Sequence, residues 1–185
     1  MSPRHDVDLE VILAGMNEYF ATHQLVELVG VVPYLRAMGE PSFAERAITD
    51  TEAYRFLWLR TRHHPIAVRV DQFGEAVTLV AKVSNSKGGY DPGRLKKNEH
   101  RVLSGSEFVV LKAVLDAAGF WSLASTTERG GLDGALWILE GRRSATHHVV
   151  VRWSPNSDGP DKLFRRACEQ LTALARLGVD AQPVY

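Results

Sequence analysis

The sequence predicts an α+β fold with a single antiparallel sheet of about six strands, packed by two or three helices in the order α-ββββ-α-ββ-α. Apolar and polar side chains alternate with a period of two between residues 53 and 103, and again between residues 135 and 153. The connections within each run are short, and strands joined by short turns are antiparallel. Helical patterns fill the gaps, where helices must cover a face of the sheet.

The first fifty residues predict a helical appendage, residues 1–50, ahead of an α+β domain, residues 51–185. A helix is expected over residues 8–29, with Gly30 and Pro33 ending it. Residues 37–50 are expected to be a connector with a short helix near residues 43–48. The helix is expected to pack on the sheet or to form a homodimer. Its apolar stripe comprises Leu9, Ile12, Leu13, Met16, Phe20, His23 and Val26.

Four strands follow as a meander. The first, residues 53–60, is apolar on both faces, which is typical of a strand covered on both sides. The next two, residues 66–71 and 77–83, alternate as a hairpin with one buried and one solvated face does, and a turn is predicted at residues 72–74. The fourth, residues 95–103, is charged and alternates poorly, as edge strands often do.

Two further helices have clear termini. Ser104 and Glu107 form a capping-box pattern, and Gly119 stands where a left-handed residue would end the helix. The last helix is predicted over residues 160–177, with Gly178 beyond its end. Cys168 lies on the apolar side of this helix, so we expect a buried, inert thiol.

Composition argues against two classes of partner. The chain holds 22 basic and 22 acidic residues, so it lacks the basic excess typical of phosphate-binding proteins, and nucleic acid is not expected. No stretch approaches the roughly 20 apolar residues of a membrane span, so no membrane association is expected. A single cysteine and no visible secretory signal favour a cytoplasmic location.

The segment over residues 131–155 is predicted to be a β-hairpin. A turn at Arg143-Ser144, or a wider one over residues 142–145, gives the same register. Glu140 then faces His147, and Trp137 faces Val150 with Arg152 on its diagonal. A three-residue loop would shift every pairing.

A carboxylate beside an imidazole can orient a catalytic base or a metal ligand. A plain cross-strand charge pair is commoner, and we favour it for Glu140 and His147. His64 would join them in a zinc-binding triad only if the two hairpins lay side by side. Without a metal-binding motif, the sequence predicts no metal and no cofactor.

The segments GLDGALWILEG and HHVVVRWSP, preceded by AYRFLWLRTRHHPIAVRV and GGYDPGRL, together resemble a family of uncharacterised bacterial proteins. The resemblance covers residues 51–178. It implies a bacterial source and a single module, and it implies no reaction.

The sequence contains no match, in spacing and structural context, to a motif that would identify a reaction. The nucleophile elbow and the phosphate-binding loop are among the motifs without a match. The sequence therefore predicts a non-catalytic binding or protein-interaction module for a protein partner or a small-molecule ligand. The alternative is a metal-dependent or His/Glu-based hydrolase that uses His64, Glu140 and His147. The predicted binding surface comprises Glu140, His147, His64, Trp137, Arg152 and Trp153.

Overall fold

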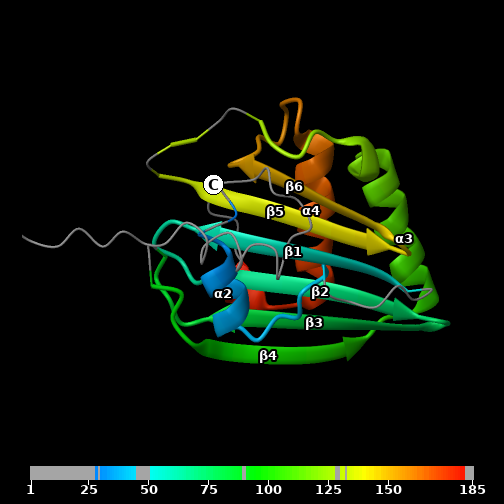
Figure 1. The fold of residues 1–185 in the computed structure, drawn as a ribbon, viewed down its shortest axis with the longest axis horizontal. Helices are drawn as coiled ribbons and strands as arrows, with labels where there is room; N and C mark the ends of the chain where they lie inside the picture. The colour runs from blue at the N-terminus through cyan, green and yellow to red at the C-terminus, as the bar shows by residue number, and fades with distance from the viewer. Residues whose placement is uncertain are drawn as a thin grey trace, which may run out of the picture.

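The computed structural model describes residues 28, 30–44, 51–88, 91–127, 130, 131 and 133–181. It confirms the α+β class: one sheet has six strands in the order β4-β3-β2-β1-β5-β6, and all neighbours are antiparallel (Figure 1). The strands are β1 Glu52–Arg60, β2 Ile66–Phe73, β3 Ala76–Ser84, β4 Leu95–Val102, β5 Ala135–Arg143 and β6 Thr146–Trp153. The helices are α2 Val32–Ala37, α3 Gly105–Ala117 and α4 Lys162–Ala175, with short 3-10 turns η2 Phe120–Ser122 and η3 Gly178–Ala181.

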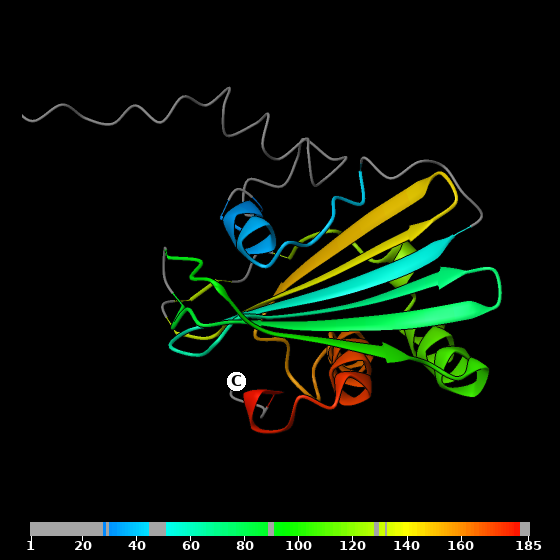
Figure 2. The same ribbon diagram turned by 90° about the horizontal axis from the view of Figure 1, so that it is seen from below.

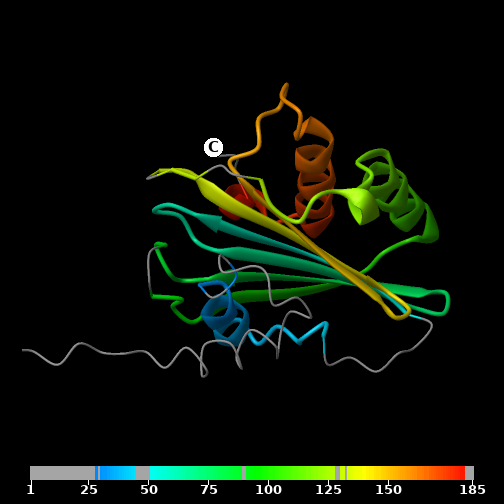
Figure 3. The same ribbon diagram turned by 45° about the horizontal axis from the view of Figure 1, so that its top comes forward.

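The helices cover opposite faces of the sheet (Figure 2). Helices α3 and α4 lie on one face, here called the α3/α4 face, and α2 lies on the other, the α2 face. The sheet is twisted, so β5 and β6 run at an angle to β3 and β4 (Figure 3). Within the described ranges, no helix is long and apolar enough to cross a bilayer.

Strand β1 is buried on both faces, as its sequence predicted. Tyr54, Phe56 and Trp58 belong to the core under α3 and α4. Leu57, on the opposite face, belongs to a second core that includes Leu35 of α2. The reason is the position of β1 in the middle of the sheet, because period-two alternation sends successive side chains into the two layers.

Helix α2 falls where the sequence predicted the end of a helix. Pro33 stands in its first turn, where the missing backbone N–H costs no hydrogen bond, so this proline helps to start a helix. The predicted helix over residues 8–29 lies outside the described residues, apart from Leu28. The described part of the first fifty residues packs on the sheet, and Leu28, Leu35 and Phe43 are fully buried or nearly so.

The start of α3 matches the predicted capping box. The Ser104 hydroxyl accepts a hydrogen bond from the Glu107 amide at 3.2 Å, and the Glu107 carboxylate accepts one from the Ser104 amide at 2.9 Å. This backbone hydrogen bond, aided by Arg101, lowers the pKa of Glu107 to about 2. After α3, Gly119 adopts a left-handed φ of 62°, as predicted.

The predicted register of the β5–β6 hairpin is wrong by two residues. Arg143 pairs with Thr146, so the turn is Ser144-Ala145, one position later than expected. Ser144 takes a φ of 51°, the left-handed conformation that a tight two-residue hairpin turn requires. Glu140 therefore faces Val149, and Trp137 faces Arg152. A shift of two keeps every side chain on its predicted face.

Candidate functional site

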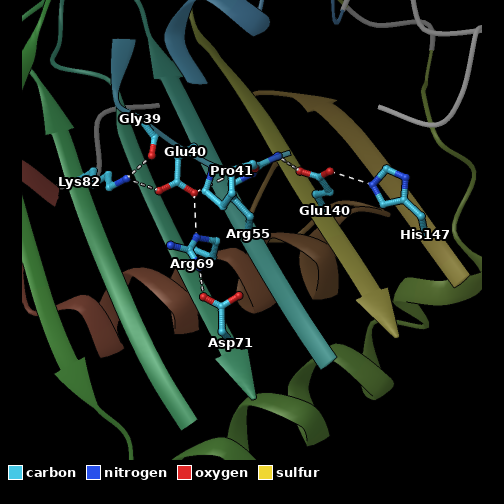
Figure 4. A network of polar contacts seen from close by, with 9 residues as sticks. All are labelled: Gly39, Glu40, Pro41, Arg55, Arg69, Asp71, Lys82, Glu140 and His147. Carbon is cyan, nitrogen blue, oxygen red and sulfur yellow. Dashed lines mark hydrogen bonds and ion pairs between the residues drawn. The ribbon is translucent and has the colours of Figure 1, made fainter. Parts of the chain in front are cut away.

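A row of alternating charges crosses the α2 face, and we call it the charge chain (Figure 4). It begins at Lys82, whose Nζ lies 2.9 Å from Oε1 of Glu40. The other carboxylate oxygen of Glu40 lies 3.0 Å from Nε of Arg69 and 3.6 Å from Nη1 of Arg55. Arg55 also forms an ion pair with Glu140. The chain therefore joins strands β3, β2, β1 and β5.

The last member of the charge chain is His147, on β6. Its Nε2 lies 2.8 Å from Oε1 of Glu140, so the predicted contact exists, although as a diagonal across the hairpin. Glu140 is 1% exposed, and each of its carboxylate oxygens is already occupied, one by Arg55 and one by His147. A carboxylate held on both sides in this way is suited to fixing structure.

The charge chain fastens the segment that follows α2 onto the sheet. Lys82 donates to the carbonyl of Gly39 at 2.8 Å, and Arg55 donates to the carbonyl of Pro41 at 2.6 Å. Glu40 stands between Gly39 and Pro41 in the sequence. Its carboxylate is surrounded by the strand cations Lys82, Arg69 and Arg55. A buried charge is tolerated when it is paired, and Glu40 is paired with the strand cations and accepts a hydrogen bond from Arg69 at Oε2.

His64 lies far from the other two members of the predicted triad. Arg142, the pairing partner of His147, also pairs with Ala53 near the start of β1, whereas His64 follows Arg60 at the end of β1. The length of β1 between these points is about 23 Å. The Nδ1 of His64 instead lies 2.6 Å from the carbonyl oxygen of Ser86. Among the described residues, no group of three or more His, Cys, Asp or Glu side chains is placed to hold a metal ion.

The two adjacent histidines of β6 point to opposite faces, as extended backbone requires. His148 lies on the α3/α4 face, where its Nε2 is 3.0 Å from the carbonyl oxygen of Leu123. Its ring meets the ring of Phe120 edge-on at 5.3 Å. Burial lowers the pKa of His148, and the positive charges of His147 and Arg152 lower it further, against the hydrogen bond to Leu123.

The remaining predicted residues do not extend this surface. Trp137 and Arg152 lie on the α3/α4 face, and the guanidinium of Arg152 bonds Asp161 at 2.8 Å. Trp153 lies on the α2 face at the far end of β6, opposite Leu136, and is half-buried. The six predicted residues are therefore divided between the two faces and the two ends of the sheet.

A cavity of about 500 Å³ lies between α4 and the sheet, and we call it the indole cavity. Trp58 of β1 and Trp137 of β5 are direct cross-strand partners there, with ring centroids 4.9 Å apart. Both indoles are almost fully buried, and neither Nε1 has a hydrogen-bond partner within the described part of the chain. The lining comprises Trp58, Trp137, Glu169, Thr172, Ala173, Arg176, Leu177 and Gly178.

A cation lies over one face of each indole ring. The guanidinium of Arg60 lies 4.4 Å from the Trp58 ring centroid, and that of Arg165 lies 5.2 Å from the Trp137 centroid. Burial lowers the pKa of Arg60 to about 10, which leaves it protonated at neutral pH. Each indole also has an N–H donor for which the described residues provide no acceptor.

Sequence reasoning found only half of this cavity. It placed Trp137 on a candidate surface, but it treated Trp58 only as part of a strand covered on both faces. The two tryptophans meet because β1 pairs with β5, and these strands are separated in the sequence by three other strands and a helix. The sequence signal that could have linked Trp58 and Trp137 is that both are inward-facing tryptophans of long, apolar strands.

A second depression, of about 360 Å³, lies on the α2 face beside Trp153, Tyr34 and Leu59. One of its walls is formed by Gly30, Val31, Pro33 and Tyr34.

No protein-family model matches the chain, and no curated protein matches it significantly in sequence.

Proposed function

We propose that this protein is a non-catalytic binding module that holds a small molecule in the indole cavity. The observation that carries the proposal is that two tryptophans of the cavity lining, Trp58 and Trp137, have buried indole N–H groups for which the described residues provide no acceptor. Buried polar groups nearly always have a partner, and leaving one unsatisfied costs about 1–3 kcal/mol. A ligand that brings an oxygen acceptor would remove this cost.

The size and lining of the cavity support a small molecule. Its volume of about 500 Å³ falls within the range of roughly 300–1,000 Å³ that is usual for ligand sites. The indoles, Ala173 and Leu177 supply apolar walls, and a few polar groups stand among them. We therefore expect a ligand with a flat apolar body and at least one oxygen acceptor.

The polar groups around the cavity support binding over catalysis. The Glu169 carboxylate accepts a hydrogen bond from Arg165 at 2.7 Å, and the Thr172 hydroxyl donates to the Cys168 carbonyl at 3.0 Å. Neither is arranged as a nucleophile beside a general base. The hydrolase alternative relies on Glu140, which the charge chain engages on both oxygens.

Nuclear magnetic resonance of the ¹⁵N-labelled protein tests the proposal directly, because the chain has four tryptophans and so four indole N–H signals. The probe is 1-naphthamide, which carries an aromatic body and a neutral carbonyl acceptor. We expect saturable downfield shifts of the Trp58 and Trp137 signals, identified with single Trp→Phe variants. Trp121 and Trp153 lie outside the cavity and serve as internal controls.

Two results would overturn the proposal. One is the absence of any saturable change in the Trp58 and Trp137 signals at millimolar probe. The other is an equal response of all four signals, which would indicate binding elsewhere or none that is specific. The Trp137→Phe variant keeps an aromatic ring but lacks one donor, and it should bind the amide more weakly than the wild type does.

A further inference from the structure

We infer that the ligand of the indole cavity is an anion whose carboxylate is recognised by Arg176. The inference rests on the proposed function and adds the charge of the ligand to it. Its basis is the balance of charge around the cavity, which differs from the balance of the whole chain, where acids and bases are equal.

Among the described residues, Arg176 is the cation of the cavity lining without a close counter-ion. The other charged member of the lining, Glu169, is neutralised by Arg165 at 2.7 Å. Arg176 has a side chain that is 71% exposed, and its ion pair with Glu107 is long, at 3.9 Å. Glu107 is already hydrogen-bonded to Arg101. Counted over the described residues, the lining therefore carries about one positive charge that is only weakly compensated.

A neighbouring depression of about 280 Å³ adjoins the indole cavity at Arg176. It shares Arg176 and Leu177 with the indole cavity, and Lys97 and Arg101 are also in its lining, against Glu99 as its one carboxylate among the described residues. Lys97 forms an ion pair with Asp180 at 2.5 Å and Arg101 forms one with Glu107, so the positive charge at the rim of the indole cavity is that of Arg176. Complementary charge of this kind selects an anionic ligand.

The C-terminal end of α4 would by itself favour a cation, because the helix dipole is negative there. Two of its last carbonyls are already satisfied, however. Leu174 accepts from Arg101 at 3.0 Å, and Ala173 accepts from the Arg176 amide at 3.3 Å. A cationic ligand would also approach two indoles that each already have a guanidinium group over one ring face. These contacts favour an anion over a cation.

Arg176 is held at the cavity by the backbone that ends α4. It is the C-cap residue, with a left-handed φ of 53°, and it lies next to Leu177 and Gly178 in the lining. An indole N–H and a guanidinium are both donors, so a carboxylate can satisfy them together, which a neutral amide oxygen does less strongly.

The test compares 1-naphthoate with 1-naphthamide, which share a ring system and differ in charge at neutral pH. Both are titrated into the wild type, Arg176→Gln and Arg166→Gln, and binding is followed by the indole N–H signals and by calorimetry. Arg166 is an exposed arginine on α4 outside the cavity lining, so its variant matches the change in net charge. Thermal melts establish that each variant is folded.

We expect the wild type and Arg166→Gln to bind the carboxylate about tenfold more tightly than the amide. In Arg176→Gln this preference should disappear, while the amide still binds. Equal binding of both probes to the wild type, or a preference that survives in Arg176→Gln, would overturn the inference and leave the proposed function standing. Binding of neither probe would reject the proposed function itself.

Discussion

Nε2 of His147 lies 2.8 Å from Oε1 of Glu140 across the β5–β6 hairpin, although neither residue is the pairing partner of the other. The contact survives a register shift of two because diagonal residues on one face remain within reach of a long side chain. It forms one end of a chain of charges whose other end is Lys82. The position of Glu40 within this chain makes it the main polar anchor of the segment after α2.

Replacing Glu40 by Gln should destabilise the protein strongly. Removal of one member of a buried ion-pair network leaves its partners uncompensated, which costs about 3–5 kcal/mol. Urea denaturation measures the change, and Glu99→Gln on the exposed strand β4 is the matched control. If the Glu40 variant were as stable as the control, the charge chain would not be an anchor.

Replacing Gly141 by Ala should also be destabilising, for a steric reason. A Cβ at this position would lie 2.5 Å from Cε1 of Phe120 and 3.1 Å from Cδ1 of Tyr54. Overpacking of this kind costs about 1–3 kcal/mol. Gly130 has open space at the corresponding point, so Gly130→Ala should be close to neutral in the same thermal melt. Equal stability of the two variants would contradict the packing described for Phe120.

Ser104→Ala should lower the free energy of unfolding by about 1 kcal/mol through the loss of the N-cap. The exposed Ser157, in the loop before α4, offers a control substitution without a capping role. Chemical denaturation distinguishes them, and a Ser104 variant with unchanged stability would mean that the cap contributes nothing measurable.

Leu115→Ala should cost more, about 2–5 kcal/mol, because it opens a cavity in the core under α3. Leu115 is 1% exposed, whereas Val109 on the same helix is 66% exposed. Val109→Ala is therefore the matched control in the denaturant series. A harmless Leu115 substitution would contradict the assignment of this helix face to the core.

His148 should make the protein less stable in mild acid. Burial holds its folded-state pKa below the ordinary value of 6.5. At pH values between the folded-state pKa and 6.5, the unfolded chain binds more protons than the folded chain does. The free energy of unfolding therefore falls as the pH drops through 6.5, and it levels off below the folded-state pKa.

The measurement is the free energy of unfolding against pH for the wild type and His148→Gln. The variant should lose less stability on acidification, whereas the exposed His100→Gln should follow the wild type. Parallel curves for the wild type and the His148 variant would show that this imidazole does not contribute to the pH dependence.

Local patterns in the sequence were sufficient for the capping box at Ser104, the left-handed Gly119 and the burial of both faces of β1. Each of these depends on residues close together in the chain. The hairpin register depended on the left-handed conformation of Ser144, which places the turn at Ser144-Ala145. Moving the turn by one position changes the partner of every residue in the hairpin. The indole cavity depended on the pairing of β1 with β5, which no local pattern specifies.

The charge chain escaped prediction for a similar reason. Glu40 lies in a stretch predicted as a connector, and its partners Arg55, Arg69 and Lys82 come from three different strands. Each of these cations stands alone among mostly apolar neighbours in its strand, so only the folded sheet brings them to one carboxylate.

A crystal structure of the protein with 1-naphthoate tests the central claim most directly. We expect the naphthalene ring between α4 and the sheet, with a carboxylate oxygen about 3 Å from the Nε1 of Trp58 or Trp137 and the other oxygen toward Arg176. A naphthoate bound at another surface, with both indole N–H groups still lacking an acceptor, would contradict it.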